Sequence, residues 1–180
     1  DAQNALGYLY QFGHGVQADP AAAATWYRRS AVAGNAEGAL NLGLAYQRGL
    51  GVEKDERQAL RWVRAAAEAG QADAQLLLGI FYLVGQGVEK DEAQGLFWVQ
   101  AAADQGHVPA QLRLGLLFES GQEVEKDLVV AHMWLSLAAE QGEGGAAAHR
   151  DRVGRSLGAR QLARSRQLVG EWRARVARTD

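Results

Sequence analysis

The amino-acid sequence predicts an all-α protein built from repeated helix pairs. A tryptophan recurs at intervals of 36 residues, and a glycine and an aspartate keep the same interval in every unit. The tryptophans are Trp26, Trp62, Trp98 and Trp134. A fixed period in this range is the signature of a repeat array, in which each unit packs mainly on its neighbours. We therefore expect four units, followed by a C-terminal basic capping region over residues 145–180; the units cover residues 1–36, 37–72, 73–108 and 109–144.

The first helix of each unit is predicted from an apolar pair four residues apart, such as Leu42 and Tyr46 within Gly38–Arg48. Residues with this spacing share one face of a helix. A glycine lies between them in the helix interior, where it costs about 1 kcal/mol relative to alanine. Because the glycine is present in all four units, we expect a close helix–helix crossing there; the positions are Gly7, Gly43, Gly79 and Gly115.

A glycine loop joins the two helices of each unit. Three units have the pattern G-x-G-V, for example Gly49-Leu50-Gly51-Val52, and the first glycine fits the left-handed residue that ends a helix. The fourth unit has Glu123 in place of the second glycine, so its loop should differ. This pattern does not predict a nucleotide site, because no strand precedes it and no third glycine follows at the required spacing.

The second helix of each unit begins after a capping aspartate, such as Asp55. An aspartate side chain can accept hydrogen bonds from the free amides of the first turn, which stabilises the helix by about 1 kcal/mol. We expect the tryptophan of this helix, for example Trp62, to pack in the core. Alanines near the helix end allow the next unit to lie close, and Gly70 should end the helix.

These residues resemble the Sel-one-like repeat, a relative of the tetratricopeptide repeat. The shared order is A-x-x-x-L-G-x-x-Y-x-x-G-x-G-V-x-x-D-x-x-x-A-x-x-W-x-x-x-A-A-x-x-G, and it covers residues 1–144. Unit one departs from it at Ser30, and unit four departs at Phe118 and Glu123. The resemblance implies a right-handed α/α superhelical solenoid of antiparallel helix pairs, and a bacterial source.

The C-terminal region is similar to the ending of bacterial members of that family. We expect one helix over Ala146–Leu157 and a longer one over Ala159–Val176, which together cap the last repeat. The longer helix has an apolar stripe made by Leu162, Val169, Trp172 and Val176. The region holds nine arginines and three acidic residues, whereas residues 1–144 hold ten basic and 18 acidic residues. Two solvated, complementary surfaces explain this asymmetry, and a tail that binds an acidic partner or nucleic acid is the alternative.

The resemblance implies a non-enzymatic adaptor that binds a protein or peptide, and an immunity protein that neutralises a secreted bacterial effector is the alternative. In such superhelices the first helices line the concave face. Residues that vary between units on these helices form an apolar middle with polar residues around it, as in a peptide groove. Burial against the neighbouring unit is the competing interpretation. The predicted partner-binding residues are Tyr8, Phe12, Asn41, Leu44, Arg48, Leu77, Ile80, Val84, Arg113 and Leu116.

No catalytic constellation is evident, so we expect no enzyme, cofactor or metal. The histidines have no metal-ligand spacing, and the chain has no cysteine. His132 takes an apolar position of the repeat, which favours a packed side chain over a ligand. Some relatives of the family that this chain resembles are linked to β-lactam binding, but no S-x-x-K motif is present: Gly51, Gly87 and Glu123 stand where the serine would be.

Other expectations concern partners and compartment. The acidic body disfavours nucleic acid, and no apolar run approaches the roughly 18 residues of a membrane-spanning helix. We expect a monomer in solution, and family resemblance favours the periplasm or secretion over the cytoplasm. The sequence opens directly on a repeat at Asp1, which is compatible with a removed leader or further repeats upstream.

Overall fold

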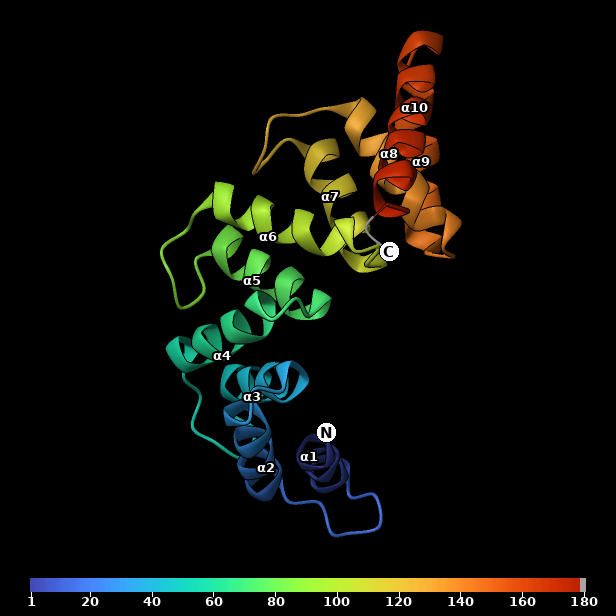
Figure 1. Ribbon diagram of the computed structural model, residues 1–180. Helices are drawn as coiled ribbons and strands as arrows, with labels where there is room; N and C mark the ends of the chain where they lie inside the picture. Colours follow the sequence, from blue (N-terminus) through green and yellow to red (C-terminus); the bar gives the residue numbers. More distant parts are fainter. Residues whose placement is uncertain (179–180) are drawn as a thin grey trace. The chain divides into compact units, whose positions relative to one another are not determined.

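The computed structural model describes residues 1–178, and these residues form ten helices and no strand. The chain divides into two compact units, Asp1–Asp91 and Glu92–Asp180. In the first unit, each helix packs on the next one along the chain (Figure 1). Its helices are α1 (Ala2–Phe12), α2 (Pro20–Val32), α3 (Ala36–Arg48), α4 (Glu56–Glu68) and α5 (Ala72–Val84).

The second unit has the same arrangement with two additional C-terminal helices. Helix α8 packs on α7, α9 and α10, and α7 also touches α9. The helices are α6 (Glu92–Asp104), α7 (Val108–Ser120), α8 (Leu128–Glu140), α9 (Gly144–Arg155) and α10 (Ala159–Val176). The predicted all-α architecture of helix pairs is therefore confirmed. Helix α10 has the predicted bounds, whereas α9 begins and ends two residues earlier than predicted.

The predicted close crossings at the helix-interior glycines are present where the structure describes them. A Cβ atom on Gly43 would lie 2.7 Å from Val63 Cγ2 and 3.2 Å from the Ala59 carbonyl oxygen of α4. On Gly7 it would lie 2.5 Å from the Tyr27 ring, and on Gly115 it would lie 2.6 Å from Leu135 Cγ. These separations are too short for a side chain, so glycine lets the paired helices approach.

The loop glycines join successive repeats. Gly51 has a φ of 71°, and a Cβ atom there would overlap the Pro20 carbonyl at the start of α2. Gly87, with a φ of 69°, makes the equivalent approach to Glu56 at the start of α4. In the fourth repeat Glu123 takes this position without a positive φ, so the predicted change of its loop is confirmed.

Capping aspartates begin the second helices as predicted. The Asp19, Asp55 and Asp127 carboxylates each accept from two backbone amides of the following helix, at 2.8 to 3.0 Å. Each second helix is followed by a glycine with a positive φ, and its value lies between 79° and 90°. Local sequence therefore determines both ends of these helices.

The tryptophans only partly meet the prediction that they form core. Trp134 is buried, with 3% of its surface exposed, and its ring meets Trp172 edge-on at a centroid distance of 6.2 Å. Trp26, Trp62 and Trp98 are half-buried instead. The Trp62 ring lies under the Arg61 guanidinium, 5.1 Å from its centroid. The prediction was wrong for these three because the buried stripe of α4 is made by smaller residues, such as Ala59 and Val63.

The C-terminal helices cover the last repeat, and acidic residues of the repeats hold them. Val153 and Leu157 complete a core with Ala131, Leu135 and Ala138 of α8. Three arginines pair with repeat carboxylates: Arg152 with Glu119, Arg173 with Glu140 and Arg175 with Asp104. Trp172 Nε1 also donates to Asp104 at 3.0 Å. Part of the basic charge of the tail is thus matched inside the chain.

None of the helices within residues 1–178 is both long enough and apolar enough to cross a membrane.

Candidate functional site

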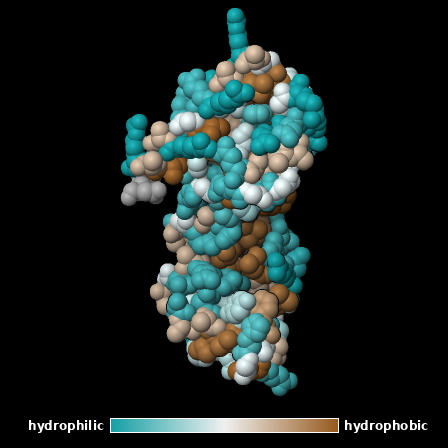
Figure 2. All heavy atoms as spheres, turned by 90° about the vertical axis from the view of Figure 1, so that its right-hand side faces the viewer, coloured by the Kyte–Doolittle hydropathy of each residue, from teal (hydrophilic) through white to brown (hydrophobic). Residues whose placement is uncertain are grey.

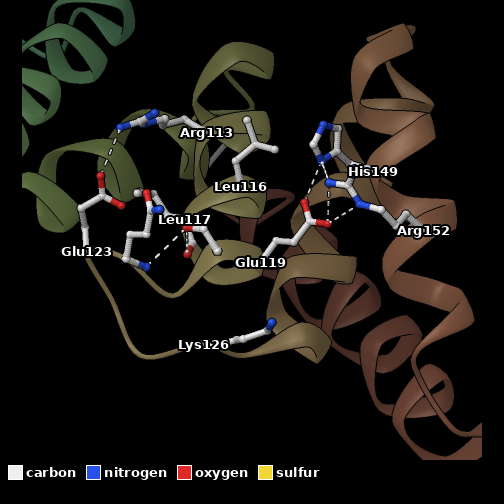
Figure 3. A pocket seen from close by; sticks show the side chains of 10 residues that line it. Arg113, Leu116, Leu117, Glu119, Glu123, Lys126, His149 and Arg152 are labelled. Atoms are coloured by element: carbon white, nitrogen blue, oxygen red, sulfur yellow. Dashed lines mark hydrogen bonds and ion pairs between the residues drawn. The ribbon is translucent and has the colours of Figure 1, made fainter.

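A surface pocket of about 440 Å³ lies between α7, the loop that follows it, and α9 (Figure 3). Two predicted partner-binding residues, Arg113 and Leu116, line it from α7. Glu123 and Lys126 line it from the loop of the fourth repeat, which is the loop without its second glycine. The pocket therefore combines apolar surface from Leu116 with charges contributed by three segments of the chain.

One wall of the pocket is a tight charge cluster around Glu119. The Glu119 carboxylate accepts from His149 Nδ1 at 2.7 Å and from Arg152 Nε at 2.9 Å, and both donors come from α9. Burial acts to raise the pKa of this carboxyl, but the hydrogen bonds from His149 and Arg152 outweigh it, so the pKa of Glu119 lies below its usual range. Glu119 is therefore a carboxylate whose hydrogen-bonding capacity is used within the protein.

The proton on His149 follows from the same geometry. Nδ1 lies 2.7 Å from both Glu119 Oε2 and Arg152 Nη2. A carboxylate and a guanidinium cannot both be satisfied by one ring nitrogen, because the carboxylate only accepts and the guanidinium only donates. Nδ1 carries a proton and donates to Glu119, which leaves Arg152 to bind the same carboxylate. The three side chains of this wall thus bind one another.

The opposite wall holds cations that are weakly used. Arg113 Nη2 lies 3.9 Å from Glu123 Oε1, which is too long for a strong ion pair, and Arg113 Nε is buried without a hydrogen-bond partner. Lys126 makes no ion pair within the described residues, and Figure 3 shows it without a partner. The pocket therefore holds two cations that the fold does not pair tightly.

The first unit gathers another group of predicted residues. Asn41, Leu44 and Arg48 of α3 line a small cavity of about 40 Å³ together with Tyr27. Asn41 Nδ2 donates to Asn4 Oδ1 at 2.9 Å, so part of its amide is already engaged. Burial, followed by Tyr8 and Glu37, raises the pKa of Tyr27 to about 12, so its hydroxyl stays neutral.

The remaining predicted residues lie on α1 and α5. Tyr8 and Phe12 are half exposed, and their rings lie 4.5 Å apart and within 6.0 Å of the His14 ring. Leu77 and Ile80 of α5 are half-buried, and Val84 is 61% exposed. Figure 2 shows exposed hydrophobic surface next to hydrophilic surface at the lower end of the view, which belongs to the first unit.

Glu119, Lys126, His149 and Arg152 were missed by sequence reasoning. Glu119 lies on α7 beside predicted residues, but its partners are 30 and 33 residues away on a helix outside the repeat pattern. One signal was available: Glu123 replaces a repeat glycine, and this departure falls in the pocket.

The structure offers no ligand set for a metal. Within residues 1–178, no group of three or more histidine, cysteine, aspartate or glutamate side chains is placed to hold a metal ion.

Comparison with solved structures gives the same fold in bacterial proteins. A Sel1 repeat protein from Oxalobacter formigenes is 37% identical, with a TM-score of 0.75 over 81% of this chain and 58% of that one. A protective antigen of uropathogenic Escherichia coli with an SLR fold is 30% identical, with a TM-score of 0.62 over 95% of this chain and 44% of that one. The chain thus spans about half the length of these two relatives.

An immunity protein from Pseudomonas aeruginosa is 24% identical, with a TM-score of 0.57 over 98% of this chain and 67% of that one, a likeness that concerns the fold. None of the curated protein sequences compared with this chain matches it. The Sel1 repeat matches four consecutive segments, residues 1–35, 36–71, 72–107 and 108–143. With its helix pairs, its crossing glycines and these four matched segments, the chain belongs to the Sel1 repeat family.

Proposed function

We propose that this chain is a non-enzymatic adaptor and that the pocket between α7 and α9 binds an acidic segment of a partner protein. Sel1 repeats are typically protein-interaction scaffolds, so a protein partner is the general expectation for the fold. The observation that carries the finer proposal is the pair of open cations, Arg113 and Lys126, beside the apolar side chain of Leu116.

Charge and shape favour a peptide. A carboxylate that approaches Arg113 would replace a long 3.9 Å contact to Glu123 with a short charge-assisted hydrogen bond. A neighbouring apolar side chain of the same segment could contact Leu116, which is half-buried. Affinity in such sites comes from a few anchors, and the charged rim determines specificity and the association rate.

Nucleic acid is less well supported by the same charges. Arg152, Arg173 and Arg175 of the tail are engaged by repeat carboxylates. Phosphate backbones need several free cations along one surface. The cations that remain at this pocket are few and stand beside Glu119 and Glu123. This arrangement suits one or two acidic side chains better than a polyanion.

The experiment uses defined probes. A short labelled peptide that alternates Glu and Leu should bind the full chain, and its Lys counterpart should not, as measured by fluorescence anisotropy. Arg113→Glu combined with Lys126→Glu should weaken the acidic probe by about tenfold or more, which corresponds to about 1.4 kcal/mol. The control reverses two charges in the first unit, Lys54→Glu with Arg57→Glu, and this variant should still bind the acidic probe. Equal losses in the two variants would show that general charge, and not the pocket, binds the probe.

The groove predicted on the first helices stays a prediction for the first unit. Its members Leu44 and Ile80 are half-buried, so part of each side chain remains available. Leu44→Asp with Ile80→Asp tests it in a capture experiment with the full chain. If the folded variant retains the partner while the Arg113 variant loses it, the partner uses the α7–α9 pocket alone.

A further inference from the structure

A second cavity, separate from the α7–α9 pocket, lies where α8, α9 and α10 meet. Its volume is about 360 Å³. Arginines reach it from two helices: Arg150 from α9, and Arg166 and Arg173 from α10. His132, Ser136 and Ser165 contribute polar groups from α8 and α10. None of these residues belongs to the repeat pattern that explains the fold.

The charge of this cavity is positive by one guanidinium. Glu140 is its one acidic lining residue. Arg173 pairs with Glu140, and Arg150 pairs with Asp151 at 2.7 Å. Arg166 is exposed and has no ion pair within residues 1–178. The cavity therefore has one arginine without an ion pair, Arg166, and two arginines that are paired with carboxylates.

The polar groups deeper in the cavity are ordered. Ser165 is fully buried, and its hydroxyl lies 2.8 Å from His132 Nδ1. Ser136 Oγ donates to the His132 carbonyl at 2.7 Å and lies 3.5 Å from Nδ1. Burial lowers the pKa of His132, and the charges of Arg150 and Arg166 lower it further. The imidazole is thus neutral at neutral pH, and the two arginines act electrostatically at the cavity.

We propose that this cavity binds a phosphate group. Three arginines line one open space, and planar guanidinium forks match phosphate oxygens in bidentate geometry. The Ser136 hydroxyl, whose proton is donated to the His132 carbonyl, lines the same space. A cation is excluded by the three arginines. The site rests on α8, α9 and α10, so it is independent of the proposed acidic-peptide pocket.

The phosphate can be inorganic or carried by an amino-acid side chain, and both sources present the same dianion. The test titrates inorganic phosphate, and separately O-phosphoserine, into the full chain at low ionic strength. Calorimetry gives the affinity. Heteronuclear NMR locates the site through the amide of Ser165 and the ring of His132, because both residues line the cavity.

Two matched variants decide the outcome. Arg166→Gln removes the unpaired cation, and Arg160→Gln removes another exposed arginine of α10 that does not line the cavity. We expect Arg166→Gln to weaken phosphate binding by about tenfold and Arg160→Gln to leave it within about twofold. Circular dichroism checks that both variants keep their helices.

Each result supports or overturns the site. Binding that moves the Ser165 and His132 signals and depends on Arg166 supports it, and the tighter of the two probes identifies the source of the phosphate. Absence of binding by both probes overturns it. Binding that weakens equally in the two variants also overturns it, because general attraction to the basic tail then suffices. Failure here leaves the acidic-peptide proposal untouched.

Discussion

Glycine occupies the interior of several helices in this chain, and its neighbours determine what one added methyl group would do. Gly43 faces α4 across a gap that a Cβ atom would close, with Val63 Cγ2 at 2.7 Å and backbone atoms of Ala59 and Val63 at 3.2 Å. Gly170 of α10 has no atom within 4 Å of the same hypothetical Cβ. A comparison of Gly43 with Gly170 therefore separates the helix-propensity cost of glycine from the close helix packing that glycine allows.

We expect Gly43→Ala to lower the free energy of unfolding by about 1–3 kcal/mol, because overpacking outweighs the better helix propensity of alanine. Gly170→Ala should raise the free energy of unfolding by up to about 1 kcal/mol. Urea unfolding followed by circular dichroism measures both. If Gly43→Ala raises the free energy of unfolding as much as Gly170→Ala does, the close crossing of α3 and α4 does not require glycine at position 43.

Glu119 makes the stability of the protein depend on pH. Its pKa is lower in the folded protein than the ordinary value of 4.5. Its contribution is therefore fully present above that ordinary value and is lost as pH falls through the lower folded pKa. Glu119→Gln should reduce the free energy of unfolding by about 1–3 kcal/mol at pH 7 and by less in acid. Urea titrations at neutral and acidic pH measure the difference.

The control for this prediction is Glu171→Gln. Glu171 also meets an arginine, at 3.1 Å from Arg164, but both side chains are 51% exposed. Exposed ion pairs stabilise by about 0–1 kcal/mol, so its effect should be small at every pH. A loss at Glu171 as large as that at Glu119 would show that the wall between α7 and α9 has no special role.

At the scale of a helix, the burial of its tryptophan distinguishes α8 from α4. Trp134 is 3% exposed and packs against Trp172 of α10, whereas Trp62 is half-buried under an arginine. Trp134→Ala should cost about 3–5 kcal/mol, the range for large core aromatics. Trp62→Ala should cost less, because Trp62 is partly exposed and its removal takes less apolar area out of the core. Thermal unfolding of the two variants gives the comparison, and equal costs would contradict it.

The repeat pattern also explains which contacts are lost in the fourth repeat. Arg28 Nη2 donates to the Tyr46 hydroxyl at 2.6 Å, and Arg64 donates to Tyr82 at 2.7 Å in the next repeat. One period after Arg64 and Tyr82, Gln100 stands in place of the arginine, and Phe118, which has no hydroxyl, stands in place of the tyrosine. Phe118 packs against the core under α9 instead. The arginine and the tyrosine of this hydrogen bond are therefore both replaced in the repeat that contacts the C-terminal helices.

At the scale of the whole molecule, the C-terminal helices complete a hydrophobic core. Removal of residues 144–180 would uncover Ala131, Leu135 and Ala138 of α8, together with Trp134. An exposed apolar face of that kind promotes association. We expect the truncated chain to elute in size-exclusion chromatography as a concentration-dependent oligomer, whereas an unchanged elution volume would argue against a capping role.

The sequence predicts the framework better than the site, for a physical reason. The framework comprises the helix ends, the crossing glycines and the loop glycines. Each of these depends on neighbours within one period, and the same residues recur in several repeats. The wall made by Glu119, His149 and Arg152 depends on a contact between a repeat and a helix outside the pattern. The half-burial of Trp62 depends on which side of α4 its neighbours occupy. Neither can be read from periodicity.

The approach of Gly51 to Pro20, and of Gly87 to Glu56, gives the repeats an order that cannot be exchanged freely. A chimera with the fourth repeat in second place would put Glu123 where a positive φ and bare backbone are required. Side-chain and backbone atoms would then compete for the same space. The fourth repeat is interchangeable with the others in length but not in position, so shuffled or extended arrays should retain it next to the cap.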